Sequence, residues 1–157
     1  MTDEGLDLIK LYEGYSSSSY LCPALHWTIG YGAIWGLDGK RVTEDHPDID
    51  EEQANQLLKR DVRNSEVAVL RQIKVTLDDG QFDALCSFVF NLGSGSLQSS
   101  TLKRKINRGD YIGAADEFPR WVFAGGRKLR GLVLRREAES YMYSGTTDRL
   151  LDKILDT

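Results

Sequence analysis

The chain has 157 residues, of which 41% are hydrophobic and 28% charged, and its net charge is -4. These values are typical of one globular domain with a packed core, with room for two closely joined lobes but not for two independent domains. The sequence holds no run of 18 apolar residues and no basic-then-apolar signal at its start, which predicts a protein made soluble. Cys22 and Cys86 are too few for a disulfide framework, so a reducing compartment is expected.

The charges are unevenly spread. Residues 1–62 carry 12 acids and 5 bases, whereas residues 103–136 carry 10 bases and 3 acids. A basic segment on an acidic protein indicates attraction to a polyanion such as nucleic acid, a membrane or an anionic cell wall, although a solvated helix face has the same composition. No aromatic ladder of the kind that binds single-stranded nucleic acid is interleaved with these bases.

The first elements follow from local signals. Thr2 or Asp3 is a suitable N-cap for a helix over residues 3–13, which Gly14 is placed to end. Residues 14–36 are rich in serine, aromatic and β-branched residues and predict a small twisted sheet of two or three short strands.

After about Asp50 the sequence predicts helices throughout. A capping-box pattern at Asp50 starts a helix of about 20 residues, unless Asn64-Ser65 breaks it. A largely apolar helix is expected at 80–92, as in the middle of a helical lobe. Further helices are predicted at 100–108, 110–122 and 131–143.

Glu13 is the first candidate for chemistry. It ends an apolar helical stripe, where the negative end of the helix dipole and partial burial both favour a protonated carboxylic acid. A general acid that protonates a glycosidic oxygen near neutral pH needs that form. The alternative is an ordinary glutamate in water at a helix end.

Cys22 and Thr28 can meet Glu13 if the predicted hairpin folds back across the helix end. Thr28 would then position a water, and Cys22 would act as a base in an inverting reaction or as a nucleophile in a retaining one. A small buried thiol is the ordinary alternative for Cys22. A thiol protease pairing Cys22 with His26 is disfavoured because one short loop aligns the two groups poorly, and no zinc spacing links the cysteines to His26 and His46.

The sequence resembles the bacteriophage lysozyme, or endolysin, family (glycoside hydrolase family 24). Its motif is a Glu, eight residues, an Asp or Cys, five residues, and the Thr of a Thr-Ile-Gly-Tyr-Gly stretch, here Glu13, Cys22 and Thr28. A second block, residues 82–93, resembles the central helix of that family. Shorter blocks follow in family order, namely Ser99-Ser100-Thr101-Leu102, Phe118-Pro119-Arg120-Trp121, Gly125-Gly126, Gly131-Leu132 and Arg135-Arg136-Glu137.

The resemblance implies an α+β, mostly α, lysozyme-like fold with two lobes in a single domain, 1–157. A small antiparallel sheet would lie in the N-terminal lobe, about 12–60. A long connecting helix would lead to a helical lobe of about 75–157, which the N-terminal helix would join, and the substrate cleft would lie between the lobes.

The implied activity is hydrolysis of the β-1,4 bond between N-acetylmuramic acid and N-acetylglucosamine in peptidoglycan, which lyses the cell. Glu13 would be the acid, Cys22 the Asp/Cys position and Thr28 the water-orienting threonine, with no metal and no cofactor. Either Arg135 or Arg136 would approach Glu13. The implied saccharide-binding residues are Ile34, Phe90 and Thr101, with Asn91 and Ser100 adjacent.

The implied partner is the peptidoglycan glycan strand, not nucleic acid. The resemblance implies a monomer without stable membrane insertion, made in the cytoplasm of the host bacterium, which reaches the wall after a holin-type partner permeabilises the membrane. Ala33 departs from the family, which often has histidine there, so reduced stability is expected. Two alternatives stay open: a lytic transglycosylase, in which the same acid acts without water, and an inactive peptidoglycan-binding module.

Overall fold

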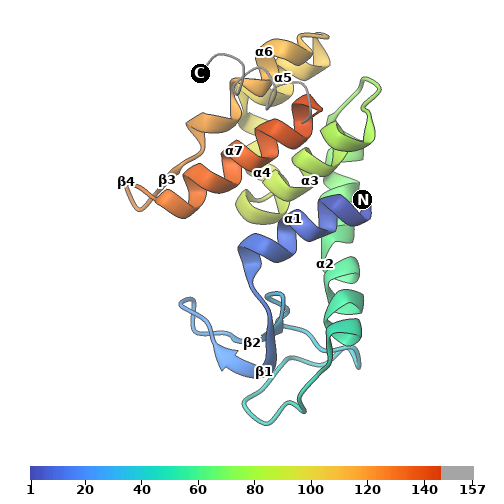
Figure 1. The fold of residues 1–157 in the computed structure, drawn as a ribbon, viewed down its shortest axis with the longest axis vertical. Coiled ribbons are helices and arrows are strands. Elements are labelled where there is room, and N and C mark those ends of the chain that lie inside the picture. The colour runs from blue at the N-terminus through green and yellow to red at the C-terminus, as the bar shows by residue number, and fades with distance from the viewer. Residues whose placement is uncertain (146–157) are drawn as a thin grey trace, which may run out of the picture. The chain divides into compact units, whose positions relative to one another are not determined.

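The computed structural model describes residues 1–145, and the chain forms two compact units (Figure 1). One unit is Ile9–Asn64, and the other is Met1–Leu8 together with the chain from Ser65 onward. The helical lobe predicted to run to residue 157 includes residues 146–157, which lie outside the described residues. The grouping of both units into a single domain stays a prediction.

The first helix, α1 (Asp3–Glu13), has the predicted bounds. Thr2 caps it, because its hydroxyl accepts a hydrogen bond from the Gly5 backbone N–H at 3.2 Å. At the other end the Gly14 N–H donates to the Lys10 carbonyl at 3.0 Å, which closes the last turn. Local capping signals therefore set both ends of this helix.

The predicted sheet is an antiparallel hairpin of β1 (Ser16–Leu21) and β2 (Trp27–Gly30). One face of the hairpin packs on the core of the Ile9–Asn64 unit, where Ile29 is fully buried. Ala33, in place of the family's frequent histidine, is also buried there and bridges Ile29. The buried hydrophobic residues of this core are Ile29, Ala33, Val42, Ile49, Ala54 and Leu57.

Helix α2 (Glu51–Gln72) is a single helix of 22 residues, so Asn64-Ser65 does not break it. At the helical rise of 1.5 Å per residue its length is about 33 Å. Asp50 begins it with the predicted capping box: the Gln53 N–H donates to Asp50 Oδ1 at 2.8 Å and the Asp50 N–H donates to Gln53 Oε1 at 3.0 Å.

The second unit is built on α3 (Asp79–Leu92) and α7 (Arg130–Ser144), which pack side by side (Figure 1). Both helices occur where the sequence predicts them. They run antiparallel, because Asn91 near the end of α3 contacts Arg136, whereas Gly80 near its start faces Met142 near the end of α7. The core between these and the shorter helices includes Leu85, Phe88, Leu97, Leu102, Ile106 and Phe118.

Three short helices and a 3₁₀ turn lie between α3 and α7, and the sequence predicts them only in part. They are α4 (Ser94–Ser99), α5 (Thr101–Asn107), α6 (Tyr111–Ala115) and η1 (Phe118–Arg120). Helix α5 confirms the helix predicted at 100–108, whereas α4 was not predicted. The helix predicted at 110–122 is wrong beyond Ala115, because Pro119 has no N–H to donate to the Ala115 carbonyl. No helix in the part of the chain that the structure describes is long and apolar enough to cross a membrane.

A second hairpin corrects the prediction that the chain is helical throughout after Asp50. Strands β3 (Phe123–Ala124) and β4 (Arg127–Lys128) pair antiparallel across a two-residue loop. The loop residues Gly125 and Gly126 have φ values of 57° and 76°. Two consecutive positive φ values suit a tight hairpin turn and require glycine, so the Gly-Gly pair interrupts the helices here.

Candidate active site

Glu13 is the last residue of α1, and its side chain is half-buried. The carboxylate lies beside the glycine-rich turn after β2: a Cβ placed on Gly32 would be 3.7 Å from Glu13 Oε2. Gly32 also has a φ of +95°, so a larger residue there would be strained and would crowd the carboxylate. Gly32, the second glycine of the Thr-Ile-Gly-Tyr-Gly stretch, thus allows the turn to approach the Glu13 carboxylate.

Cys22 and Thr28 belong to one face of the first hairpin. Thr28 is paired directly with Tyr20 across the two strands, and directly paired residues project to the same face. Cys22 follows Tyr20 by two residues and continues the ladder, since its N–H donates to the His26 carbonyl at 3.0 Å, so it shares that face. Thr28 is buried, with 3% of its surface exposed, while Cys22 is partly exposed.

The charge of Glu13 also acts on a residue of this hairpin, Tyr20. The pKa of the Tyr20 hydroxyl is raised, first by burial and then by the negative charges of Cys22 and Glu13. Because Coulomb interactions weaken with distance, both charges must lie close enough to Tyr20 to disfavour the phenolate. Glu13 and Cys22 therefore both lie within electrostatic range of Tyr20, a residue that the sequence did not single out.

The Cys22 thiol lies in a setting that favours its thiolate. The pKa of Cys22 is lowered, chiefly by a hydrogen bond from the His26 backbone and also by one from the Thr28 hydroxyl, while desolvation opposes the change. The Thr28 hydroxyl also lies 2.9 Å from the His26 carbonyl oxygen, and because it has one proton it donates either to that oxygen or to the thiolate. The His26 ring, the candidate base of a thiol protease, contacts the Arg41 guanidinium through Nδ1 at 3.1 Å.

The predicted saccharide-binding residues divide between the two units. Ile34 lies in the Ile9–Asn64 unit, where its carbonyl accepts from the Val42 N–H at 2.9 Å. Phe90 and Asn91 occupy the last turn of α3 in the other unit, both half-buried. Their contact with a saccharide, and that of Ile34, stays a prediction.

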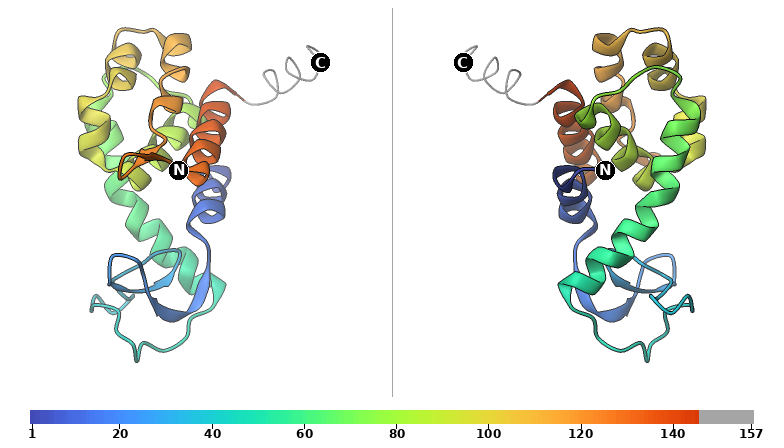
Figure 2. Two further views of the ribbon diagram at one scale, coloured as in Figure 1. Left: turned by 90° about the vertical axis from the view of Figure 1, so that its left-hand side faces the viewer. Right: turned by 90° about the vertical axis from the view of Figure 1, so that its right-hand side faces the viewer.

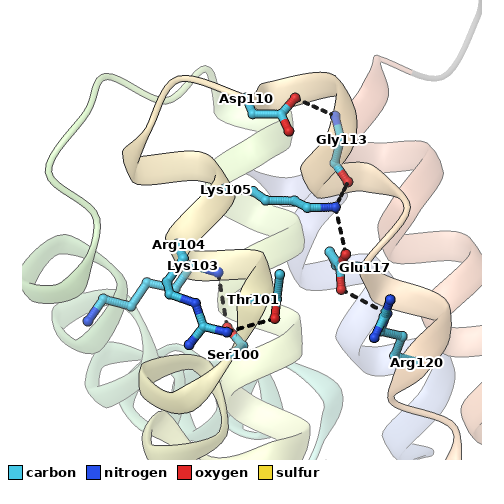
Figure 3. A network of polar contacts seen from close by, with 9 residues as sticks. All are labelled: Ser100, Thr101, Lys103, Arg104, Lys105, Asp110, Gly113, Glu117 and Arg120. Carbon is cyan, nitrogen blue, oxygen red and sulfur yellow. Dashed lines mark hydrogen bonds and ion pairs between the residues drawn. The ribbon is translucent and has the colours of Figure 1, made fainter.

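Ser100 and Thr101 meet at the start of α5 (Figure 3). The buried Ser100 hydroxyl donates to the Leu97 carbonyl at 2.6 Å and accepts from the Lys103 N–H at 3.0 Å, so it serves as the N-cap of α5. Thr101 accepts from the Arg104 guanidinium at 2.8 Å. Their role in saccharide binding stays a prediction.

Arg135 and Arg136 are buried on α7 and share one carboxylate, that of Glu139. The Arg136 and Arg135 guanidiniums lie 2.7 Å and 3.6 Å from Glu139 Oε1, and the Ser87 hydroxyl donates to the same oxygen at 2.9 Å. Arg136 also donates to the side-chain oxygen of Asn91 at 2.8 Å. Glu139 was not predicted from the sequence, although its spacing of three and four residues from the two arginines indicates a shared helix face. The prediction that one of these arginines approaches Glu13 stays a prediction.

Comparison with known proteins places the chain in a family. The family model for phage lysozyme matches residues 10–139. An endolysin of Acyrthosiphon pisum secondary endosymbiont phage 1 is 41% identical over 148 residues, which cover 91% of this chain and 97% of that protein. The chain spans only about half the length of two Bacillus phage endolysins that it also matches, 53% for phage B103 and 57% for phage PZA.

Solved structures agree with these relatives. A variant of P22 lysozyme superposes with a TM-score of 0.86 at 32% identity, covering 92% of this chain and 97% of its own. The endolysin from Escherichia coli O157:H7 phage FAHEc1 gives a TM-score of 0.81 at 38% identity, covering 90% and 91%. These likenesses confirm the predicted mostly helical, lysozyme-like fold with a small antiparallel sheet. The chain belongs to the phage lysozyme family.

Proposed function

We propose that Glu13, Cys22 and Thr28 form the catalytic centre that hydrolyses the β-1,4 bond between N-acetylmuramic acid and N-acetylglucosamine. As a member of its family the chain is a peptidoglycan-hydrolysing lysozyme, and the proposal assigns the reaction to particular residues. The observation that carries it is the place of the Glu13 carboxylate beside the Gly32 turn, which closely follows the strand of Thr28, while Cys22 and Thr28 share one face of the hairpin. An acid and a water-activating pair are the groups that glycoside hydrolysis requires.

In this reaction Glu13 donates its proton to the glycosidic oxygen as the bond to the muramic acid C1 breaks. Thr28 orients a water through its hydroxyl, and the Cys22 thiolate takes a proton from that water as its oxygen attacks C1. The lowered pKa of Cys22 supports the base role, because it increases the fraction of thiolate at pH values below the usual pKa of a cysteine. A product of retained configuration at C1 would instead assign Cys22 the role of nucleophile.

The proposal extends to the residues carried over from the family. Contact with the saccharide is assigned to Ile34, Phe90, Asn91, Ser100 and Thr101. We propose that a monomer made in the host cytoplasm reaches the wall once a holin-type partner has permeabilised the membrane, which the similarity to endolysins supports. Expression with and without such a permeabilising protein tests this release, with lysis expected only when both are present.

Product mass tests the reaction itself. Purified protein is incubated with purified peptidoglycan, and the soluble muropeptides are analysed before and after borohydride reduction. Hydrolysis predicts reducible muramic acid ends. A lytic transglycosylase would release anhydro products that are lighter by one water and resist reduction, and an inactive binding module would release nothing, so either result contradicts the proposal.

A further inference from the structure

The unneutralised bases of the basic segment gather at two places. Glu117 neutralises two of the bases, Lys105 at 2.7 Å and Arg120 at 3.0 Å (Figure 3). Glu139 faces Arg135 and Arg136 in the core. The bases that make no ion pair with any residue in the described part of the chain are Lys103 and Arg104 on α5, Arg108 at its C-cap, and Arg127, Lys128 and Arg130 at the second hairpin.

The second hairpin presents its charges on a defined backbone. Arg127 and Lys128 form β4, and Arg130 begins α7 directly afterwards, all three exposed. The hairpin is closed by the Gly-Gly turn, and its base is tied by a hydrogen bond from the Leu129 N–H to the Val122 carbonyl at 3.0 Å. Phe123, paired with Lys128 across the strands, is 61% exposed, so the hairpin offers an apolar ring beside its bases.

This hairpin lies at the same end of the α3–α7 pair as two predicted saccharide-binding residues, Phe90 and Asn91. Arg136 contacts Asn91, and Arg130 precedes Arg136 by six residues, a rise of about 9 Å along the helix. The opposite end is marked by Gly80, whose position faces the Met142 carbonyl. Figure 2 shows the short hairpin at the N-terminal end of α7, away from the helix end that leads to residue 145.

We propose that this hairpin binds the carboxylates of the peptide stems that peptidoglycan carries on its muramic acid. The inference rests on the proposed function. The lactyl carboxyl of muramic acid is consumed in the amide bond to the stem, so the free carboxylates of this substrate lie in the peptide and not in the sugars. Arginine forks bind carboxylates through paired, charge-assisted hydrogen bonds, and Phe123 supplies contact area for aliphatic parts of a stem.

The position of the hairpin favours this partner over a lipid surface or nucleic acid. A glycan strand bound at Phe90 and Asn91 would carry its peptide stems close to Arg127 and Lys128, because both sites lie at one end of the α3–α7 pair. Three bases and one aromatic ring match one or two carboxylates on a short peptide. They are few for a polyanion whose binding depends on neutralising many phosphates.

The experiment removes either the negative charge of the stem carboxylates or the positive charge of the hairpin. Peptidoglycan is treated with carbodiimide and ammonium, which converts stem carboxylates to carboxamides and leaves the glycan and the stems in place. KM and kcat are measured on untreated and amidated material for the wild type and for Arg127→Gln/Lys128→Gln. Lys103→Gln/Arg108→Gln, on α5 and at its C-cap, loses the same charge from exposed or half-buried unpaired bases and is the matched control, and Arg127→Lys/Lys128→Arg retains the charge.

For the wild type we expect amidation to raise KM about fivefold to tenfold with little change in kcat, as two partly exposed ion pairs would give. The Gln double variant should have the raised KM on both materials, while the α5 control and the charge-retaining variant should behave as the wild type. Equal KM values for wild type on the two materials, or the same loss in the α5 control, would overturn the proposal. A hairpin variant that loses binding to anionic phosphatidylglycerol vesicles but keeps the wild-type KM ratio would assign the hairpin to lipid instead. A wild type that cuts neither material contradicts the proposed function and not the stem assignment alone.

Discussion

Glu139→Gln should be among the most destabilising single changes in the described part of the chain. Glu139 and Arg136 are both 0% exposed, and the Arg136 guanidinium lies 2.7 Å from Glu139 Oε1. Arg135 lies 3.6 Å from the same oxygen, so this one carboxylate faces two buried guanidiniums. The substitution preserves size and the Ser87 contact but removes the negative charge that faces both guanidiniums.

The magnitude follows from this geometry. Removing one partner of a buried ion pair costs about 3–5 kcal/mol, and Glu139→Gln belongs at the upper end because its carboxylate faces two buried arginines. Arg136→Met belongs near 3 kcal/mol, because Glu139 retains Arg135 and the Ser87 hydroxyl. The double variant should lose less than the sum of the single losses, with a coupling of at least about 1 kcal/mol.

Urea unfolding followed by circular dichroism measures these differences. With a slope of about 2 kcal/mol per M, a loss of 4 kcal/mol lowers the midpoint by about 2 M. Arg63→Met, at an exposed base without an ion pair to any described residue, should stay within about 0.5 kcal/mol of wild type. A loss below about 1 kcal/mol for Glu139→Gln, or strict additivity in the double variant, would refute the view that these charges depend on one another.

Two further predictions concern titration. Because a thiolate at Cys22 is the proposed base, turnover should fall as the pH drops through the lowered pKa of that thiol. Cys22→Ser should be severely impaired, whereas Cys22→Asp should keep activity and move the acidic limb of the pH–rate profile to about pH 4, the range of a carboxylate. Full activity of Cys22→Ala would exclude the thiol from the reaction. Burial raises the pKa of both Cys86 and Tyr143, so above their ordinary values of 9.0 and 10.0 the unfolded chain loses protons that the folded chain retains, and the free energy of unfolding should decline with rising pH. Tyr143→Phe and Cys86→Val, which remove these groups, should each flatten that decline in urea titrations at pH 8 to 11, and a slope equal to wild type would contradict the burial argument.

The elements that the sequence predicts well are those with local signals. The capping box at Asp50 brings donor and acceptor together within four residues, so it acts before tertiary structure exists. The predicted hairpin also places Cys22 and Thr28 on one face. Because Thr28 pairs with Tyr20 across the strands, Cys22 and Thr28 share a face although six positions separate them in the sequence.

The elements that the sequence misses depend on distant partners. Helix α4 has a Gly-Ser-rich sequence with low helix propensity, and the burial of Leu97 in the core holds it in place. Glu139 lies fully buried on a helix where a charged residue is usually exposed, and only its distant partner Ser87 and the neighbouring arginines explain that. The second hairpin is different, because it has a local signal: the pair Gly125-Gly126 predicts a two-residue hairpin turn from the sequence alone.

The most direct test of the proposed chemistry is the turnover of Glu13→Gln on purified peptidoglycan, measured as reducing ends released per enzyme. The amide retains the size of the side chain and removes its proton, so kcat should fall at least about 10³-fold, while the urea midpoint remains that of the wild type. A variant that folds normally and retains more than a tenth of the wild-type turnover would show that another group donates the proton.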